Sequence, residues 1–322
     1  MLSRIKDWTS KTISKKECLE ILQSSNDWWE YYARAVLTKK QKTGNQMRLN
    51  TLMNAKSGLC AEDCGYCAQS KTSSAPINQY ALLPKAEIVH KALIAKKNKA
   101  SVFCIAISAT RPSSKELLEL GEAVKEIKKI MEIEICLSCG LLREEQVKYL
   151  KEVGIDRINH NLNTPKENYP NITTTHTYED RMDTLKQLQE YQVNICSGFI
   201  CGMGETSEQL VDLAFELKEQ QPYSVPVNFL LAIEGTKLEN TNELTPLKCL
   251  KIVSMLRLVF PDTELRVSAG REFHLGSLQP LVLLIVDSIF LGNYLTEKGA
   301  EISEDQALLK ELGLEIVGDK ND

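Results

Sequence analysis

Short apolar segments alternate with longer amphipathic segments along most of the chain. The apolar segments have the length and residue types of buried strands, whereas the longer ones repeat apolar residues with the period of a helix. The expected strands cover residues 47–54, 101–108, 133–138, 156–162, 193–200, 224–231, 264–268 and 287–291. The expected helices cover residues 85–96, 113–131, 143–153, 179–191, 205–219, 246–259, 278–286 and 304–312.

Strands that alternate with helices in this way predict an α/β fold, a (β/α)8 barrel of the TIM type over residues 47–316. In such a barrel the active site is built from the loops that follow the carboxyl ends of the strands. An open, doubly wound sheet is the alternative. That fold would need an early glycine-rich turn for phosphate binding, and the sequence has none.

The residues before the barrel, 1–46, are expected to form a helical extension. Ser14 and Glu17 have the spacing of a capping box, so a helix should begin directly after Ser14. Aromatic side chains should pack the extension onto the barrel; they are Trp28, Trp29, Tyr31 and Tyr32. The polar residues 317–322 are expected to form a frayed tail.

Composition narrows the class of protein. The 322 residues are 43% hydrophobic with a net charge of −4 and no long basic run, which gives no support for nucleic-acid or membrane-surface binding. Residues 1–7 are charged and unlike a secretory signal, and the apolar stretch 281–286 is far shorter than a membrane span. Ten cysteines then indicate reduced thiols or metal ligands. We expect a cytoplasmic metalloprotein.

Three cysteines lie close together just after the first expected strand: Cys60, Cys64 and Cys67, with the spacing C-x3-C-x2-C. Each iron of a cubane needs one external ligand, so three local thiolates would leave one iron open for a reactive molecule. A zinc site completed by Asp63 or a distant histidine is the alternative. The trio, ending in Tyr66-Cys67, resembles the radical S-adenosylmethionine (SAM) superfamily, in which SAM chelates the open iron.

A second group of residues lies within the expected strands. Cys104, Cys136, Cys196 and Arg266 fall in the second, third, fifth and seventh strands. If all four point inward, they converge inside the barrel and form a second metal site. The alternative is that the cysteines only fill the barrel and the arginine forms a salt bridge. The other cysteines are expected to be structural; they are Cys18, Cys139, Cys201 and Cys249.

Asn159 and Asn161 should share one face of the fourth strand, and Asn228 lies in the sixth. An amide offers donors and an acceptor, which suits a ureido ring that offers both in return. The alternative is that these amides only satisfy backbone groups or each other. His160 has the opposite parity and is expected in the wall of the site. No spacing of nucleophile and base supports triad chemistry.

Over nearly its whole length the chain resembles the biotin synthase family. The resemblance is carried by residues 60–67, 103–104, 136, 159–163, 172–178, 196–198, 202–206, 225–228 and 266–272. It implies a homodimer of (β/α)8 barrels, each with two clusters. Cys60, Cys64 and Cys67 match the ligands of a [4Fe-4S] cluster. Cys104, Cys136, Cys196 and Arg266 match those of an auxiliary [2Fe-2S] cluster.

The resemblance also implies the small-molecule contacts. Asn159, Asn161 and Asn228 match positions near the ureido ring of dethiobiotin. Positions near SAM are matched by Tyr66, Asn161, Asn163 and the segment 198–205, with Gly198, Ile200 and Glu205. Many family members carry Asp where this chain has Asn163, so the expected ribose contact lacks a charge here.

The implied reaction is the last step of biotin synthesis, in which sulfur is inserted between two unactivated carbons of dethiobiotin. A 5′-deoxyadenosyl radical from SAM abstracts hydrogen, and the auxiliary cluster donates the sulfur. No side chain need act as acid or base. The implied electron donor is a flavodoxin or a ferredoxin. The rival readings are a radical SAM relative without an auxiliary sulfur source, a non-catalytic iron–sulfur electron carrier, and a zinc-stabilised scaffold.

Overall fold

The computed structural model describes residues 11–317. Its parallel strands close into a ring in the order β1-β2-β3-β4-β5-β7-β8-β9, with β9 paired to β1, and β6 continues the position of β5 beside β7. The strands are β1 (Gln46–Lys56), β2 (Val102–Ile107), β3 (Glu134–Ser138), β4 (Arg157–Asn159), β5 (Asn194–Cys196), β6 (Phe199–Cys201), β7 (Ser224–Phe229), β8 (Glu264–Val267), β9 (Ser288–Leu291) and the short β10 (Glu315–Ile316). The predicted (β/α)8 barrel is therefore confirmed.

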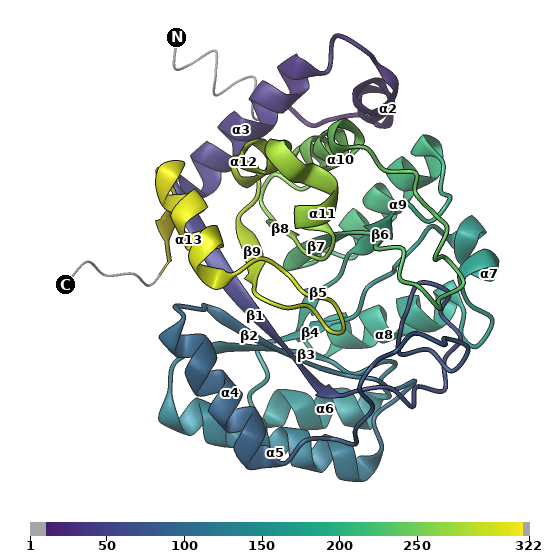
Figure 1. Ribbon diagram of the computed structural model, residues 1–322, viewed down its shortest axis with the longest axis vertical. Helices are drawn as coiled ribbons and strands as arrows, with labels where there is room; N and C mark the ends of the chain where they lie inside the picture. The colour runs from purple at the N-terminus through teal and green to yellow at the C-terminus, as the bar shows by residue number, and fades with distance from the viewer. Residues whose placement is uncertain (1–10, 318–322) are drawn as a thin grey trace.

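Helices surround the ring of strands (Figure 1). They are α4 (Lys85–Lys97), α5 (Ser114–Ile130), α6 (Glu144–Glu152), α7 (Tyr169–Ile172), α8 (Tyr178–Glu190), α9 (Ser207–Glu219), α10 (Pro246–Val259), α11 (Arg271–Leu275), α12 (Gln279–Leu283) and α13 (Ile302–Glu311). Two 3-10 turns, Lys166–Asn168 and Gly276–Leu278, precede α7 and α12. None of the helices in the described part of the chain combines the length and apolarity needed to cross a membrane.

Two helices precede the barrel, α2 (Lys15–Gln23) and α3 (Trp29–Thr43), at the top of Figure 1. The capping box is formed as predicted, with the Ser14 side chain accepting from the Glu17 N–H and the Glu17 side chain accepting from the Ser14 N–H. Trp28 is buried, whereas Trp29 is 51% exposed. The division of the chain between residues 46 and 47 stays a prediction. The expected tail lies outside the described residues, except for residue 317.

The barrel strands have two faces that meet different neighbours. Phe103, Ile105 and Ile195 point into the large core between strands and helices. Cys104 and Cys196, their neighbours in sequence, pack in a separate small cluster inside the ring, together with Val102, Cys136 and Phe290. Since side chains alternate along a strand, this split fixes which residues can reach the interior.

Ion pairs fill the amino-terminal end of the barrel. Arg157, on β4, is fully buried and bonds Glu264 of β8 at 3.2 Å and also pairs with Glu134 of β3. Arg48 of β1 also reaches Glu264, at 3.5 Å. This network links four strands next to the cluster of cysteines, because Arg157 is in register with Cys136.

Two predicted strands differ from the structure. The fourth ends at Asn159, so Asn161 lies in the loop beyond the strand and not on its face. The fifth is broken into β5 and β6 at Ser197 and Gly198. Glycine is required at this break, since a Cβ at Gly198 would lie 1.8 Å from the Pro226 carbonyl oxygen on β7. The N-cap of α9 is Thr206.

Candidate functional site

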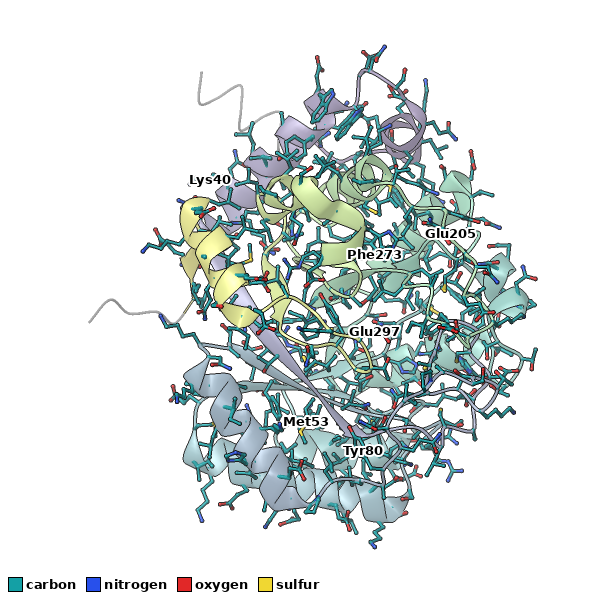
Figure 2. The ribbon with its side chains drawn as sticks, viewed as in Figure 1. Lys40, Met53, Tyr80, Glu205, Phe273 and Glu297 are labelled. Atoms are coloured by element: carbon teal, nitrogen blue, oxygen red, sulfur yellow. The ribbon has the colours of Figure 1, made fainter. Side chains whose placement is uncertain are left out.

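A cavity of about 350 Å³ opens at the carboxyl ends of the strands. Residues of both expected cysteine groups and all three expected amides line it: Cys60, Cys64, Cys67, Cys104, Cys136, Arg266, Asn159, Asn161 and Asn228. Glu297, on the loop between β9 and α13, lies at the mouth and is labelled near the centre of Figure 2. The cavity therefore brings together residues far apart in the sequence at the end of the barrel where active sites form.

The loop with the first cysteine trio, residues 60–67, is tied to neighbouring loops by its backbone. The Gly65 N–H donates to the Ile172 carbonyl at 2.8 Å, and the Leu238 N–H donates to the Gly65 carbonyl at 3.2 Å. Among the cysteine side chains, Cys64 has a weak contact of 4.0 Å with the Thr173 hydroxyl, and all three side chains line the cavity.

Burial keeps these thiols protonated. It raises the pKa of Cys60 and Cys64, and it raises the pKa of Cys67 to about 12. The nearby Arg181 guanidinium opposes the shift at Cys64. Metal ligation needs thiolates, so binding of a cluster would have to displace protons from these groups.

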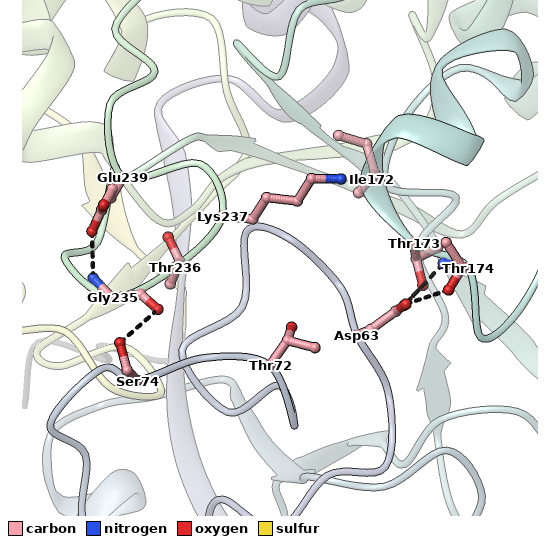
Figure 3. A pocket seen from close by; sticks show the side chains of 10 residues that line it. All are labelled: Asp63, Thr72, Ser74, Ile172, Thr173, Thr174, Gly235, Thr236, Lys237 and Glu239. Atoms are coloured by element: carbon pink, nitrogen blue, oxygen red, sulfur yellow. Dashed lines mark hydrogen bonds between the residues drawn. The ribbon is translucent and has the colours of Figure 1, made fainter.

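Asp63 does not line the cavity and points toward Thr173 and Thr174 (Figure 3). Its carboxylate accepts bonds from the Thr173 hydroxyl at 2.7 Å, from the Thr174 N–H at 2.9 Å and from the Thr175 hydroxyl at 3.0 Å. These bonds lower the pKa of Asp63 against the opposing effect of burial, the largest single contribution. Asp63 is engaged in holding the loop and does not complete a metal site with the cysteines.

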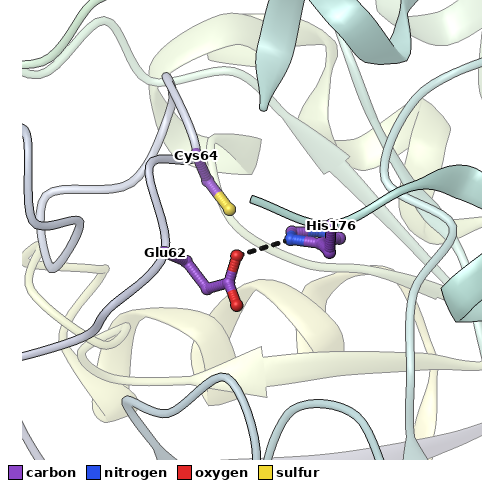
Figure 4. Close-up of side chains that lie close together, drawn as sticks. All are labelled: Glu62, Cys64 and His176. Atoms are coloured by element: carbon purple, nitrogen blue, oxygen red, sulfur yellow. Dashed lines mark hydrogen bonds and ion pairs between the residues drawn. The ribbon is translucent and has the colours of Figure 1, made fainter. Parts of the chain in front are cut away.

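Glu62 points inward instead, toward Cys64 and His176 (Figure 4). One ligand atom from each of these three residues lies within 4.8 Å of the others, and the Glu62 and His176 side chains are hydrogen-bonded at 2.7 Å. Among residues 11–317, these three side chains form the group that is close enough together to bind a single metal ion, and it contains only one of the three cysteines of the loop. A zinc site built on the whole trio therefore finds no support in the geometry.

The strand cysteines converge as predicted. Cys104 and Cys136 are in register on β2 and β3, and Cys196 lies on β5 within the same buried cluster. Hydrogen bonds among the thiols, then burial, raise the pKa of Cys196, while Arg266 opposes the shift. Cys196 does not line the cavity, and the other two cysteines do.

Arg266 is only 1% exposed and has no carboxylate partner of its own among the described ion pairs. Its Nη2 donates to the Cys196 sulfur at 3.4 Å and its Nε donates to the Ser268 hydroxyl at 3.2 Å. Its guanidinium lies 4.5 Å from the ring centre of Phe290, and its Nη1 has no hydrogen-bond partner within the described part of the chain. A buried cation with an unused donor beside three thiols fits an anionic cluster at this place.

The three amides are arranged around the same space. Asn159 Nδ2 donates to Asn161 Oδ1 at 3.0 Å and lies 3.4 Å from the Cys196 sulfur. Asn228 bonds the backbone of Phe199 and Ala269, at 3.3 Å each. Both alternatives foreseen for these amides are thus realised in part, yet each amide keeps further donor or acceptor capacity toward the cavity.

The residues expected near SAM fall into two sets. Tyr66, Asn161, Asn163 and Ile200 line the cavity. Gly198 lies behind the wall, where its N–H donates to Asn161 Oδ1 at 3.1 Å. Glu205 is turned away from the cavity: its carboxylate accepts from the Gly202 and Met203 N–H groups at 2.6 and 2.8 Å.

Some cavity residues escaped the sequence reasoning. Arg181, on α8, lies beside Asn161 and donates to its carbonyl oxygen at 3.0 Å. Tyr294, on the loop after β9, lines the cavity and donates to the Ser268 carbonyl oxygen at 3.1 Å. A helix arginine and a loop tyrosine carry no distinguishing spacing, so no signal in the sequence could have selected them. His160 lies in the wall, as expected.

The remaining cysteines lie in the hydrophobic core. Cys18, Cys139, Cys201 and Cys249 are fully buried there, and all ten cysteines of the chain are free. None of the four lines the cavity, so the two predicted sets account for every cysteine at the candidate site.

Comparison with known proteins agrees with this site. Residues 56–217 match the family model of the radical SAM superfamily, and residues 226–315 match that of the biotin and thiamin synthesis associated domain. A biotin synthase of Streptococcus agalactiae is 57% identical over 303 residues, covering 94% of this chain and 92% of the relative. A biotin synthase of Bacillus cytotoxicus is 46% identical, covering 95% and 92%.

Solved structures agree at the level of the fold. A methylornithine synthase superposes with a TM-score of 0.85 at 19% identity, covering 97% of both chains. An FeFe-hydrogenase maturase from Carboxydothermus hydrogenoformans gives 0.83 at 18% identity, covering 98% of this chain and 78% of that one. On the strength of the sequence relatives, the chain belongs to the biotin synthase family of radical SAM enzymes.

Proposed function

We propose that the cavity is the place where this enzyme inserts sulfur into dethiobiotin, between two iron–sulfur clusters held by the two cysteine sets. The enzyme converts dethiobiotin to biotin and is a sulfurtransferase that uses SAM. The observation that carries the proposal is that one cavity is lined both by Cys60, Cys64 and Cys67, from the loop after β1, and by Cys104, Cys136 and Arg266, from the barrel strands.

Cys60, Cys64 and Cys67 would hold the [4Fe-4S] cluster, and Cys104, Cys136, Cys196 and Arg266 would hold the [2Fe-2S] cluster. When bound, the clusters and SAM supply the one-electron chemistry that breaks unactivated C–H bonds, and the auxiliary cluster supplies the sulfur atom.

The protein's own part is placement. Asn159, Asn161 and Asn228 would orient the ureido ring, because each amide still offers groups to the cavity. Tyr66, Asn163 and Ile200 would contact SAM nearer the mouth, with Gly198 supporting Asn161 from behind. Glu205 would act on SAM only indirectly, by ordering the turn at Gly202 and Met203. The closed lower end of the barrel keeps water away from that side of the reacting groups.

Three further parts of the proposal rest on the family resemblance. The electron donor is a flavodoxin or a ferredoxin, the enzyme is a homodimer, and it works in the cytoplasm. The ten free cysteines agree with a reducing compartment.

The test is product mass after anaerobic incubation of reconstituted protein with dethiobiotin, SAM and a reductant. Reconstitution with isotopically labelled sulfide distinguishes the sulfur source: labelled biotin supports donation by the auxiliary cluster, and unlabelled biotin contradicts it. The iron content of the Cys196→Ala variant distinguishes this proposal from a radical SAM enzyme without an auxiliary cluster. In the latter case, replacement of Cys196 would leave the iron content unchanged.

A further inference from the structure

A chain of three polar side chains runs from the wall of the cavity to the loop with the cysteine trio. Arg181 Nη1 donates to the Asn161 carbonyl oxygen at 3.0 Å, and Arg181 Nε donates to His176 Nε2 at 3.2 Å. His176 Nδ1 then bonds Glu62 Oε2 at 2.7 Å (Figure 4). Glu62 lies between Cys60 and Cys64 in the sequence.

The bonds fix the proton on His176. Since an arginine nitrogen can only donate, His176 Nε2 must accept, and the ring proton is on Nδ1, where it donates to Glu62. The ring is therefore a neutral bridge between a half-buried cation and a buried carboxylate. Burial and the Arg181 charge lower the pKa of His176, in agreement with a neutral ring.

Glu62 connects the cysteine loop to its surroundings. Its carboxylate also accepts from the Thr175 hydroxyl, and its carbonyl oxygen accepts from the Lys71 N–H at 2.9 Å. The side chain is nearly fully buried and has an oxygen within 4.8 Å of the Cys64 sulfur. A buried carboxylate this close to a cluster ligand is costly unless donors face it, and the side chains of Thr110, Thr175 and His176 all donate to it.

We propose that His176 is a positioning residue for the first cluster: by donating to Glu62 it holds the cysteine loop in the geometry that receives the cluster and keeps a negative charge beside Cys64. The inference rests on the proposed function only through the assignment of Cys60, Cys64 and Cys67 as cluster ligands.

The first test uses protein without clusters, so it is independent of activity. Hydrogen exchange of the backbone amides of residues 60–67 is compared for wild type, His176→Leu and His176→Asn, with residues 102–107 of β2 as internal reference. His176→Leu should exchange roughly tenfold faster in the loop, because a buried charge-assisted bond is lost. His176→Asn should restore protection, since its amide nitrogen takes the place of Nδ1.

Thr177→Ala is the matched control. Thr177 caps α8 next to His176 but makes no contact with Glu62 in the described hydrogen bonds. The substitution weakens the start of α8 but leaves the hydrogen bond between His176 and Glu62 in place. The amides of residues 60–67 should therefore exchange at the wild-type rate. Equal exchange in wild type and His176→Leu, or equal acceleration in His176→Leu and Thr177→Ala, would overturn the proposal.

The second test uses reconstituted protein and reads the cluster itself. Glu62→Gln removes the charge beside Cys64 while keeping the shape, so the midpoint potential of the [4Fe-4S] cluster should become more positive. An unchanged potential would show that the charge has no influence there. If the wild-type protein binds no [4Fe-4S] cluster, the proposed function fails. If the wild type binds the cluster and the variants match it in loop exchange and cluster potential, only the role of His176 is refuted.

Discussion

Cys104 and Cys136 lie directly opposite each other on the parallel strands β2 and β3. Neighbouring strands are about 4.8 Å apart, so both side chains, which share the inner face, can reach the same small group. Cys196 joins them from β5, and Arg266 of β8 donates to its sulfur. The site thus draws on strands from both halves of the barrel.

Replacement of Cys196 by Ala should remove the auxiliary cluster and biotin formation while SAM cleavage persists, because thiolates carry the charge that holds iron. Arg266→Lys should keep the cluster and measurable biotin formation, since three thiolates remain and a guanidinium stays protonated. Iron content, the visible spectrum and biotin yield of both reconstituted variants are the measurements. Wild-type biotin yield from Cys196→Ala would show that the sulfur comes from elsewhere.

Replacement of Cys64 by Ala should abolish SAM cleavage and leave the fold intact. The loop is held mainly by the Gly65 backbone and the Asp63 carboxylate, and the thiol adds only a weak contact of 4.0 Å with Thr173. SAM cleavage after reduction, together with the circular dichroism of the variant, gives the answer. Cys249→Ala is the control, because Cys249 is also buried but lies in the core on α10. Full SAM cleavage by Cys64→Ala would remove Cys64 from the ligand set.

Asn163 requires a choice of substitutions that respects its backbone. Its φ is +69°, in the left-handed region, where asparagine and glycine are tolerated. Asn163→Asp should bind SAM as well as wild type or better, whereas Asn163→Gly should weaken binding by about 1–2 kcal/mol through the lost hydrogen bond. SAM affinity by calorimetry tests both.

Asn163→Leu is a less clean probe, because a branched side chain at this φ adds strain of about 1–2 kcal/mol that has nothing to do with SAM. Its stability without SAM must therefore be measured beside its affinity. Identical SAM affinities for wild type, Asn163→Asp and Asn163→Gly would exclude a contact between this side chain and SAM.

Replacement of Gly198 by Ala should destabilise the cluster-free protein by at least about 2 kcal/mol, because the new methyl group would overlap the Pro226 carbonyl. The variant should also bind SAM more weakly, since the Gly198 N–H supports Asn161. Gly204→Ala is the control: it has φ +90° but open space around its Cβ, so it suffers strain alone. Denaturant unfolding of both variants should rank Gly198→Ala as the less stable, and the reverse order would contradict the steric argument.

The sequence predicted the barrel and the inner face of its strands because both follow from fixed periods. Once Cys104 and Arg266 were assigned to strands, the alternation of side chains allowed both to point inward, and the structure places them inside the ring. The same reasoning failed at Asn161, because the end of a strand depends on what the next loop contacts. It also missed the break at Gly198, where the carbonyl of a residue distant in sequence leaves no room for a side chain.

Loop contacts escaped prediction for a related reason. Glu62 and His176 are 114 residues apart, and nothing in either segment encodes their meeting. Arg181 looked like an ordinary polar residue of an amphipathic helix. Such pairs are decided by how βα loops fold over the barrel end, which no local pattern describes.

The ion network of Arg157, Glu264 and Arg48 at the amino-terminal end of the barrel has a consequence for the order in which molecules leave the cavity. Arg157 and Glu264 are buried and do not line the cavity, whereas Tyr294 and Glu297 do, so we expect molecules to enter and leave on the side of Tyr294 and Glu297. A molecule seated beside Cys136 is then trapped beneath whatever occupies the space near Cys64. Under the proposed function, the products of SAM cleavage should leave first, because they lie near Cys64. A reaction intermediate beside Cys136 should then stay in the cavity until a second SAM molecule binds.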